Sequence, residues 1–163
     1  MTSATPRVSV GMPVFNLEAC VARAIESVLA QTFDELELIV SDNGSTDGTE
    51  AICRRYAARD ARIRYTRQAP AISGFDNFRY VLDAARAPYF MWLPADDFVL
   101  PGLLGRAVAV LDARPDVVSC VPRVEFLERD GTPRRAPGTF ALMGALDDNL
   151  RLFLRDPMDN SRF

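Results

Sequence analysis

The sequence contains no histidine, and every one of its 19 basic residues is arginine, so lysine is absent as well. Without an imidazole there is no Ser–His–Asp or Cys–His nucleophile, and without an amine there is no P-loop lysine or Schiff-base chemistry. Acid and base catalysis therefore has to come from the 22 carboxylates. The net charge of −3 gives no reason to expect a nucleic-acid partner.

Long hydrophobic runs and closely spaced cysteines are lacking too. No run approaches the roughly 18 apolar residues of a membrane span, and the polar start of the chain has no apolar signal-peptide core. Cys20, Cys53 and Cys120 are odd in number and far apart, which favours small buried side chains in a reducing compartment over disulfides or a metal site. We expect a cytoplasmic protein, and peripheral attachment at the inner face of a membrane is compatible with this expectation.

Short β-branched runs alternate with amphipathic stretches along the sequence. The length of 163 residues predicts a single domain over 1–163, with a flexible start at 1–7. The predicted strands cover 8–14, 36–41, 63–66, 89–93 and 117–121, followed by the start of a hairpin at 124–127. The predicted helices cover 17–31, about 49–59, 77–85, 101–114 and 146–155, with Asn16 capping the first and Ser73 or Asp76 the third. This alternation predicts an α/β fold with a mostly parallel sheet flanked by helices.

Polar side chains follow three of the predicted strands: Asn16, then Asp42 with Asn43, then Asp96 with Asp97. Because ligands bind outside the carboxyl ends of parallel strands, we expect these clusters to meet at one edge of the sheet. The turn after the first strand has no G-x-G-x-x-G fingerprint, so a bound diphosphate would need another source of positive charge. The adjacent carboxylates at 96 and 97 offer two hard oxygen ligands for Mg²⁺ or Mn²⁺.

Three segments together carry a resemblance to a known family. VSVGMPVFN (8–16), SVLAQTFDELELIVSDNGSTDGT (27–49) and PYFMWLPADDFVLPGLL (88–104) resemble the three successive blocks of the family 2 glycosyltransferases of GT-A fold. The resemblance implies a Rossmann-like, nucleotide-binding sheet and inverting transfer from a UDP-, dTDP- or GDP-linked sugar with Mn²⁺ or Mg²⁺. The acceptor is left open as a saccharide, a lipid or a protein.

The first block supplies Pro13, Phe15, Asn16 and Glu18. By resemblance these residues flank the nucleoside, with Phe15 against the base. The alternative for Phe15 is an ordinary core side chain.

The second block supplies Asp42 and Asn43, which the resemblance assigns to hydrogen bonds with base or ribose. Asn77, near the start of the third predicted helix, joins the same nucleotide-sugar-binding set. The alternative for Asp42 and Asn43 is a role in the turn and the helix cap alone.

The third block is the metal motif, in which Pro94 stands where the first aspartate of an Asp-x-Asp motif often lies. We therefore expect Asp97 to bind the metal, either with Asp96 or while Asp96 faces the ribose or diphosphate. In an inverting reaction the acceptor hydroxyl also needs a general base, usually a carboxylate.

The expected base motif of the acceptor half is missing. The tail offers only Asp147, Asp148, Asp156 and Asp159, and none of them matches the family's base. We expect an N-terminal, donor-binding part that is truncated before the acceptor half. Two alternatives stay open at this stage: a non-catalytic nucleotide- or partner-binding domain of the same fold, and a homodimer that hides the apolar surface left by the missing half.

Overall fold

The structure, a computed structural model, describes residues 5–122, 124–127 and 132. The chain divides into two units, residues 1–122 and 123–163, and the helices and strands below belong to the first. The strands are β1 (Val8–Val14), β2 (Leu36–Asp42), β3 (Ile63–Arg67) and β4 (Tyr89–Trp92). The helices are α1 (Val21–Leu29), α2 (Thr49–Ala57), α3 (Gly74–Asp83) and α4 (Leu103–Ala113).

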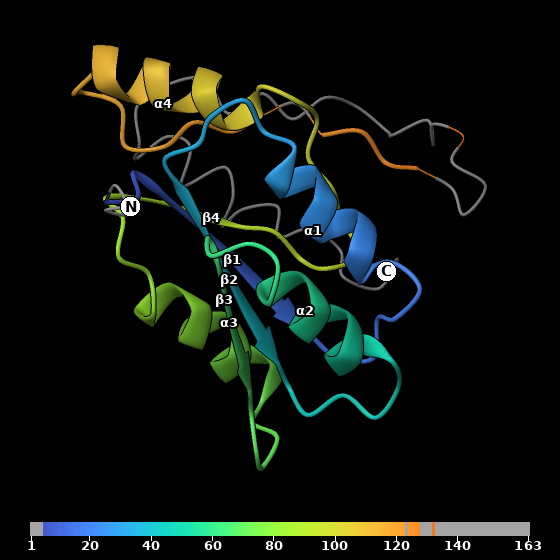
Figure 1. The fold of residues 1–163 in the computed structure, drawn as a ribbon. Helices are drawn as coiled ribbons and strands as arrows, with labels where there is room; N and C mark the ends of the chain where they lie inside the picture. Colours follow the sequence, from blue (N-terminus) through green and yellow to red (C-terminus); the bar gives the residue numbers. More distant parts are fainter. Residues whose placement is uncertain (1–4, 123, 128–131, 133–163) are drawn as a thin grey trace, which may run out of the picture. The chain divides into compact units, whose positions relative to one another are not determined.

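The strands form one parallel sheet in the order β3-β2-β1-β4. Helices α1 and α2 lie on one face of the sheet and α3 on the other (Figure 1). The α/β prediction with a parallel sheet is therefore confirmed. The register pairs Val14 with Asp42 and Asp42 with Arg67, so the carboxyl ends of β1, β2 and β3 lie level with one another.

The core lies between the central strands and the helices. Strands β1 and β2 are buried along their whole length, which explains why they read as nearly continuous apolar runs instead of alternating ones. Helix α1 buries Val21, Ala24, Ile25 and Val28, which are spaced to form a single stripe. Burial of this stripe fixes α1 as a rigid element beside the sheet.

Two predicted helix starts are wrong. Helix α1 begins at Val21 with Cys20 as its N-cap, and Asn16 is a left-handed residue of the preceding loop, with φ of 52°. Asparagine tolerates this conformation because its short side chain can bond locally. Helix α4 begins at Leu103, after Gly102 with φ of 77°, and not at 101. Of the two caps predicted for α3, Ser73 and Asp76, the structure has Ser73, whose hydroxyl accepts a hydrogen bond from the Asp76 N–H.

The predicted strand at 117–121 is also wrong, because these residues pair with no strand among the described residues. Val118 and Val121 are 83% and 77% exposed, so their β-branched side chains pack against nothing that would stabilise a strand. Of the predicted hairpin only 124–127 is described, with an isolated bridge at Leu127, and the predicted helix at 146–155 lies outside the described residues.

The three cysteines differ in burial more than the sequence suggested. Cys53 is buried, and its burial raises the pKa of its thiol to about 12. Cys20 is partly buried and Cys120 is exposed, so the expectation of small buried side chains holds fully only for Cys53.

Gly11 in β1 leaves room for the Phe90 ring of β4 and for the Val81 side chain of α3. A Cβ at this position would lie 2.6 Å from the Phe90 ring and 2.8 Å from a methyl group of Val81. We therefore expect Gly11→Ala to lower the free energy of unfolding by about 1 to 3 kcal/mol through overpacking. Urea denaturation measures the change. Gly74→Ala is the control, because nothing lies within 4 Å of a Cβ at position 74, and it should leave stability equal or slightly higher.

Glu37 of β2 is a buried carboxylate at the amino end of the sheet. It accepts hydrogen bonds from the Ser9 hydroxyl (2.7 Å), the Arg86 N–H (2.9 Å) and the Arg64 guanidinium (2.9 Å). Burial alone would raise its pKa, but these hydrogen bonds outweigh burial and lower it below the ordinary 4.5.

This lowered pKa predicts an acid-sensitive contribution to stability. The contribution is complete above the unfolded value near 4.5 and is lost as the pH falls through the lower folded value. Glu37→Gln should therefore flatten the fall in unfolding free energy between pH 5 and pH 3, as followed by urea denaturation at several pH values. Glu35→Gln, at an exposed neighbouring position, should keep the wild-type slope.

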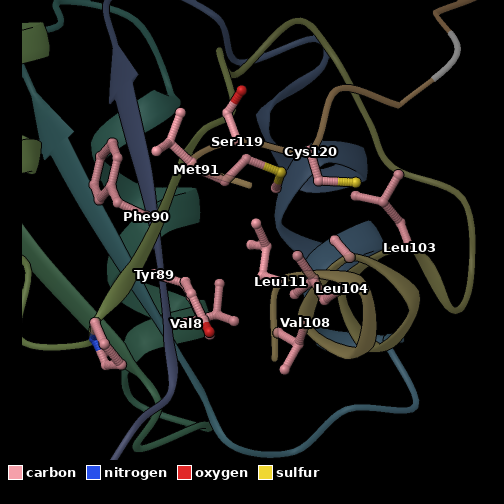
Figure 2. A pocket seen from close by; sticks show the side chains of 13 residues that line it. Val8, Tyr89, Phe90, Met91, Leu103, Leu104, Val108, Leu111, Ser119 and Cys120 are labelled. Atoms are coloured by element: carbon pink, nitrogen blue, oxygen red, sulfur yellow. The ribbon is translucent and has the colours of Figure 1, made fainter. Parts of the chain in front are cut away.

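An apolar cavity of about 220 Å³ lies beside α4. Figure 2 shows Leu104, Val108 and Leu111 of α4 facing Val8, Tyr89 and Met91, with Ser119 and Cys120 at one side. Val8 and Tyr89 are the first residues of β1 and β4, so this cavity adjoins the amino ends of the strands. Its lining includes none of the residues predicted to bind the nucleotide or the metal.

Candidate functional site

The loops that follow β1 and β2 are joined by hydrogen bonds at the carboxyl edge of the sheet. The Asn16 side-chain oxygen accepts from the Thr46 N–H at 2.8 Å, and the Asn16 N–H donates to the Ser45 hydroxyl at 2.9 Å. The Leu17 N–H donates to the Thr49 hydroxyl at 2.9 Å. Asn16 is thus brought to the second polar cluster, as predicted, with its amide oxygen already bonded to the protein.

Glu18 bonds the same second loop near the start of α2. Its carboxylate accepts from the Gly48 N–H at 2.6 Å, and its N–H donates to the Asp47 carboxylate at 3.1 Å. Asp47 also accepts from the Thr49 N–H at 2.9 Å. Both carboxylates therefore satisfy N–H groups at the amino end of α2, where negative charge is favourable.

Asp42 ends β2 as a fully buried carboxylate. One oxygen accepts from the Ser45 N–H at 2.8 Å, the other from the Tyr65 hydroxyl at 2.9 Å, and an Arg67 nitrogen lies 3.7 Å away. Burial, followed by the bond to Asp42, raises the pKa of Tyr65 and keeps it a hydrogen-bond donor. Asp42 thus fixes the turn after β2 and joins it to β3.

Asn43 holds the loop that follows β3. Its amide nitrogen donates to the Ile72 carbonyl at 2.8 Å, and its oxygen accepts from the Ile72 N–H at 2.8 Å. The buried side chain of Asn77 bonds the end of β2 as well. Its amide oxygen accepts from the Ser41 hydroxyl at 2.6 Å, and its amide nitrogen donates to the Ser41 carbonyl at 3.1 Å. These pairs bring residues 68–73 to the edge that Asp42 and Asn43 occupy.

Pro13 and Phe15 differ sharply in exposure. Pro13 is buried within β1, while the side chain of Phe15, just beyond the strand, is 53% exposed. The core alternative for Phe15 therefore does not hold. Its ring presents apolar surface at the carboxyl edge, as a stacking partner for a planar base requires.

Asp96 and Asp97 follow β4 and are both exposed. The Asp97 N–H donates to the Pro94 carbonyl at 3.0 Å, which closes a turn. Partial burial, followed by the neighbouring charge of Asp96, raises the pKa of Asp97, while Arg23 acts in the opposite direction. The two side chains are therefore accessible acidic groups at the carboxyl end of the strand beside β1.

The donor set at this turn fits a divalent metal that is shared with a ligand. The described residues contain no group of three or more His, Cys, Asp or Glu side chains that could hold a metal by themselves. Two carboxylates are what Mg²⁺ or Mn²⁺ uses when substrate phosphates and water complete its shell. The residues that would hold such an ion are Asp96 and Asp97.

Sequence reasoning missed Tyr65 at this edge, and it expected residues 67–76 to form a loop near the donor without assigning contacts to Arg67 or Gln68. Tyr65 and Arg67 contact Asp42, and the Gln68 amide donates to the Ser41 hydroxyl at 2.9 Å. The signal was present in the chain order, because the end of the third strand has to lie at the same edge as the ends of the first two.

The assembled edge combines three kinds of surface. Phe15 offers an exposed ring, the loop at 68–73 offers backbone groups held by Asn43, and the turn at 94–97 offers two carboxylates. Such an edge can hold a planar base, a sugar and a metal-bound diphosphate. The described part of this edge contributes carboxylates and no imidazole or amine.

Comparison with solved structures places the fold in the GT-A class. The chain is similar to TarS of S. aureus, with a TM-score of 0.62 and 23% identity over 67% of this chain and 20% of that one. It is also similar to the mannosyltransferase PcManGT from Pyrobaculum calidifontis, solved with GDP-Man and Mn²⁺ (TM-score 0.53, 24% identity, 58% of this chain and 29% of that one).

The chain belongs to glycosyl transferase family 2, whose model matches residues 9–158. Its relatives include the uncharacterized glycosyltransferase EpsJ of Bacillus subtilis, 33% identical over 71% of this chain and 33% of that protein. Another is a GalNAc(5)-diNAcBac-PP-undecaprenol β-1,3-glucosyltransferase of Campylobacter jejuni, 35% identical over 61% of this chain and 32% of that protein. The chain thus spans about a third of the length of these relatives. The resemblance inferred from the three sequence blocks is confirmed, and the family is one of enzymes.

Proposed function

We propose that the carboxyl edge of this sheet binds a nucleotide-diphospho-sugar with a divalent metal, as the donor-binding part of an enzyme that transfers the sugar. The observation that carries the proposal is the placement of the exposed Asp96–Asp97 pair after β4, at the same edge as the joined loops after β1, β2 and β3. The two carboxylates are suited to the metal and its diphosphate. The exposed aromatic ring and the backbone held by Asn43 are suited to the base and the sugar.

Each group of the edge has a part in this proposal. Phe15 packs against the base, while Asn43 holds the backbone at Ile72 as a wall beside it. Asn16, Glu18, Asp42 and Asn77 keep the surrounding loops in place through the hydrogen bonds described above. Asp97, with Asp96 beside it, would hold Mn²⁺ or Mg²⁺.

The bound metal would supply Lewis-acid stabilisation of the negative charge that develops on the leaving nucleoside diphosphate. The residues of this chain orient the donor so that its anomeric carbon is open to the acceptor. Proton removal from the acceptor hydroxyl is left to a carboxylate that we do not assign among the described residues.

The solved neighbours support a nucleotide-linked donor. TarS was solved with UDP and with UDP-GlcNAc, and PcManGT with GDP-Man and Mn²⁺. A UDP-, GDP- or dTDP-linked sugar with Mn²⁺ or Mg²⁺ is accordingly proposed for this chain.

For the acceptor we propose a saccharide, on a carrier lipid or free, with a protein acceptor as the alternative. The name of the Campylobacter relative specifies a saccharide linked through a diphosphate to undecaprenol, which supports the first choice. A lipid-linked acceptor also supports our proposal of a cytoplasmic protein that works at the inner face of a membrane. In the described part of the chain, none of the helices has the length and apolar character needed to cross a bilayer.

We also propose the homodimer that the sequence left open as an alternative, and α3 and β4 offer a candidate surface for it. Helix α3 and β4 leave an apolar groove of about 370 Å³ exposed. Its apolar lining consists of Phe75, Phe78, Leu82 and Trp92. A second copy would remove this patch from water.

Calorimetric titration of UDP, GDP and dTDP, each with and without Mn²⁺, tests the proposed function. We expect one nucleotide to bind in a metal-dependent manner. If a chain shown by circular dichroism to be folded binds none of the three, the donor-binding proposal is wrong for this chain, and a non-catalytic, partner-binding domain of the same fold becomes the better account.

A further inference from the structure

The segment that follows Asp97 lies along one face of α1. Arg23, Ser27 and the adjoining Gln31 are four residues apart, so they form one row on the helix surface. This row is polar, in contrast to the apolar stripe that the same helix buries in the core. Helix α1 therefore packs its apolar face against the sheet and contacts the loop after β4 with its polar face.

Each residue of the row contacts the segment 98–104. The Arg23 guanidinium lies 4.2 Å from the centre of the Phe98 ring. The Ser27 hydroxyl oxygen accepts from the Val99 N–H at 3.2 Å while its own proton is donated to the Ala24 carbonyl at 2.7 Å. Successive turns of α1 thus hold successive residues of the loop.

Gln31 makes the largest number of these bonds from a nearly inaccessible side chain, 4% exposed. Its amide nitrogen donates to the Leu100 carbonyl at 3.0 Å and to the Ser27 carbonyl at 3.1 Å. Its oxygen accepts from the Leu104 N–H at 3.2 Å. Gln31 therefore joins the end of α1 to the loop and to the first turn of α4.

On the side before Asp96 the loop is held by the Leu93 N–H, which donates to the Gly11 carbonyl at 2.9 Å, and by the burial of Leu93 and Ala95 in the core. On the side after Asp97, residues 98–102 belong to neither a helix nor a strand, so ladder hydrogen bonds do not fix that part. A site of this kind reaches its working geometry only when the side chains around it hold the backbone. The row on α1 is the group of side chains placed to do this.

We propose that Ser27 and Gln31 are positioning residues for the metal, because they hold the loop that presents Asp96 and Asp97. The inference rests on the proposed function. It assigns to α1 the role of holding the metal-binding loop, and none of the predicted site residues lies on this helix. Neither side chain touches the metal or the nucleotide in this account. Their effect passes through the backbone at Val99, Leu100 and Leu104.

The test compares Ser27→Ala, Gln31→Met and Ser27→Thr with the wild-type chain. Two quantities are measured with the nucleotide that the wild-type chain binds: the Mn²⁺ concentration that gives half-maximal nucleotide binding, and the affinity for that nucleotide without metal. We expect the alanine and methionine variants to need about tenfold more Mn²⁺, in line with the usual effect of groups behind a metal ligand. Nucleotide affinity without metal should be unchanged, and Ser27→Thr, which keeps the hydroxyl, should retain the wild-type Mn²⁺ requirement.

Ser9→Ala is the matched control for lost stability. Ser9 is buried and bonded to Glu37 at the amino end of the sheet, so its loss should destabilise the fold without changing the Mn²⁺ requirement. Hydrogen exchange at 98–104 gives a readout that needs no nucleotide. Exchange there should become faster in Ser27→Ala and Gln31→Met and should stay unchanged in Ser9→Ala.

The outcomes separate this inference from the proposed function. If nucleotide binding by the wild-type chain depends on Mn²⁺ but the variants need no more Mn²⁺ than the wild type, the positioning role is wrong and the proposed function stands. If exchange at 98–104 is not faster in the variants, α1 does not hold the loop and the inference also fails. If the wild-type chain shows no Mn²⁺-dependent binding of UDP, GDP or dTDP, the proposed function fails and this inference fails with it.

Discussion

Replacing Asp97 by alanine should weaken Mn²⁺-dependent nucleotide binding by more than about 100-fold. Loss of a residue that only hydrogen-bonds a metal ligand already lowers metal affinity by about 10- to 100-fold, and the loss of a ligand itself should cost more. The carboxylate is exposed after β4, so its loss removes a metal ligand without opening the core. Isothermal titration of the nucleotide at fixed Mn²⁺ measures the effect. Binding without metal should change little.

Asp34→Ala is the matched control, because it also removes one exposed negative charge. Asp34 lies before β2, and its contact with Arg62 is a loose pair at 3.6 Å. A general effect of net charge would appear in both variants. Equal Mn²⁺-dependent binding by wild type and Asp97→Ala would remove Asp97 from the metal site.

Replacing Asp42 by alanine should lower the free energy of unfolding by about 3 to 5 kcal/mol, because it leaves two donors at a buried position unsatisfied, at about 1 to 3 kcal/mol each. The substitution leaves the Ser45 N–H and the Tyr65 hydroxyl without their acceptor, while Arg67 keeps its nearer carboxylate partner, Glu50, at 3.3 Å. Because the carboxylate is fully buried, water cannot easily replace it. Urea denaturation followed by circular dichroism measures the loss.

Tyr65→Phe separates the parts of this effect. It removes one hydrogen bond to Asp42 and retains the ring, so it should cost only about 1 to 2 kcal/mol. A cost for Asp42→Ala no greater than that of Tyr65→Phe would mean that the carboxylate does not organise this edge, and that the hydrogen bond from Ser45 and the ion pair with Arg67 contribute little.

The order of elements was predictable because the underlying periodicities are local. Apolar runs at 8–14 and 36–41 and the helical stripe through Val21 and Ile25 belong to single segments, and each formed where the pattern indicated. The starts of α1 and α4 were not predictable in this way. They depend on bonds between distant segments, such as the one from the Thr46 N–H to Asn16 that holds the first loop outside the helix.

The site shows the same division between local and distant information. Its predicted location followed from the ends of parallel strands, since Asp42 ends β2 and Asp96 follows β4, and both strands pair with β1. The partners of those residues did not follow, because Tyr65 comes from the next strand and Ile72 from a loop beyond it. Sequence spacing indicates where a strand ends. It does not indicate which side chains from other segments will contact the residues at that end.

Crystals of the chain grown with Mn²⁺ and the nucleotide selected by calorimetry test the central claim most directly. Anomalous scattering from manganese locates the ion without assumptions about the ligand. The account predicts a peak about 2 Å from a carboxylate oxygen of Asp97 and from an oxygen of the diphosphate, with the base beside Phe15. A nucleotide bound elsewhere, for example in the cavity beside α4, or a manganese ion that contacts neither Asp96 nor Asp97, would contradict it.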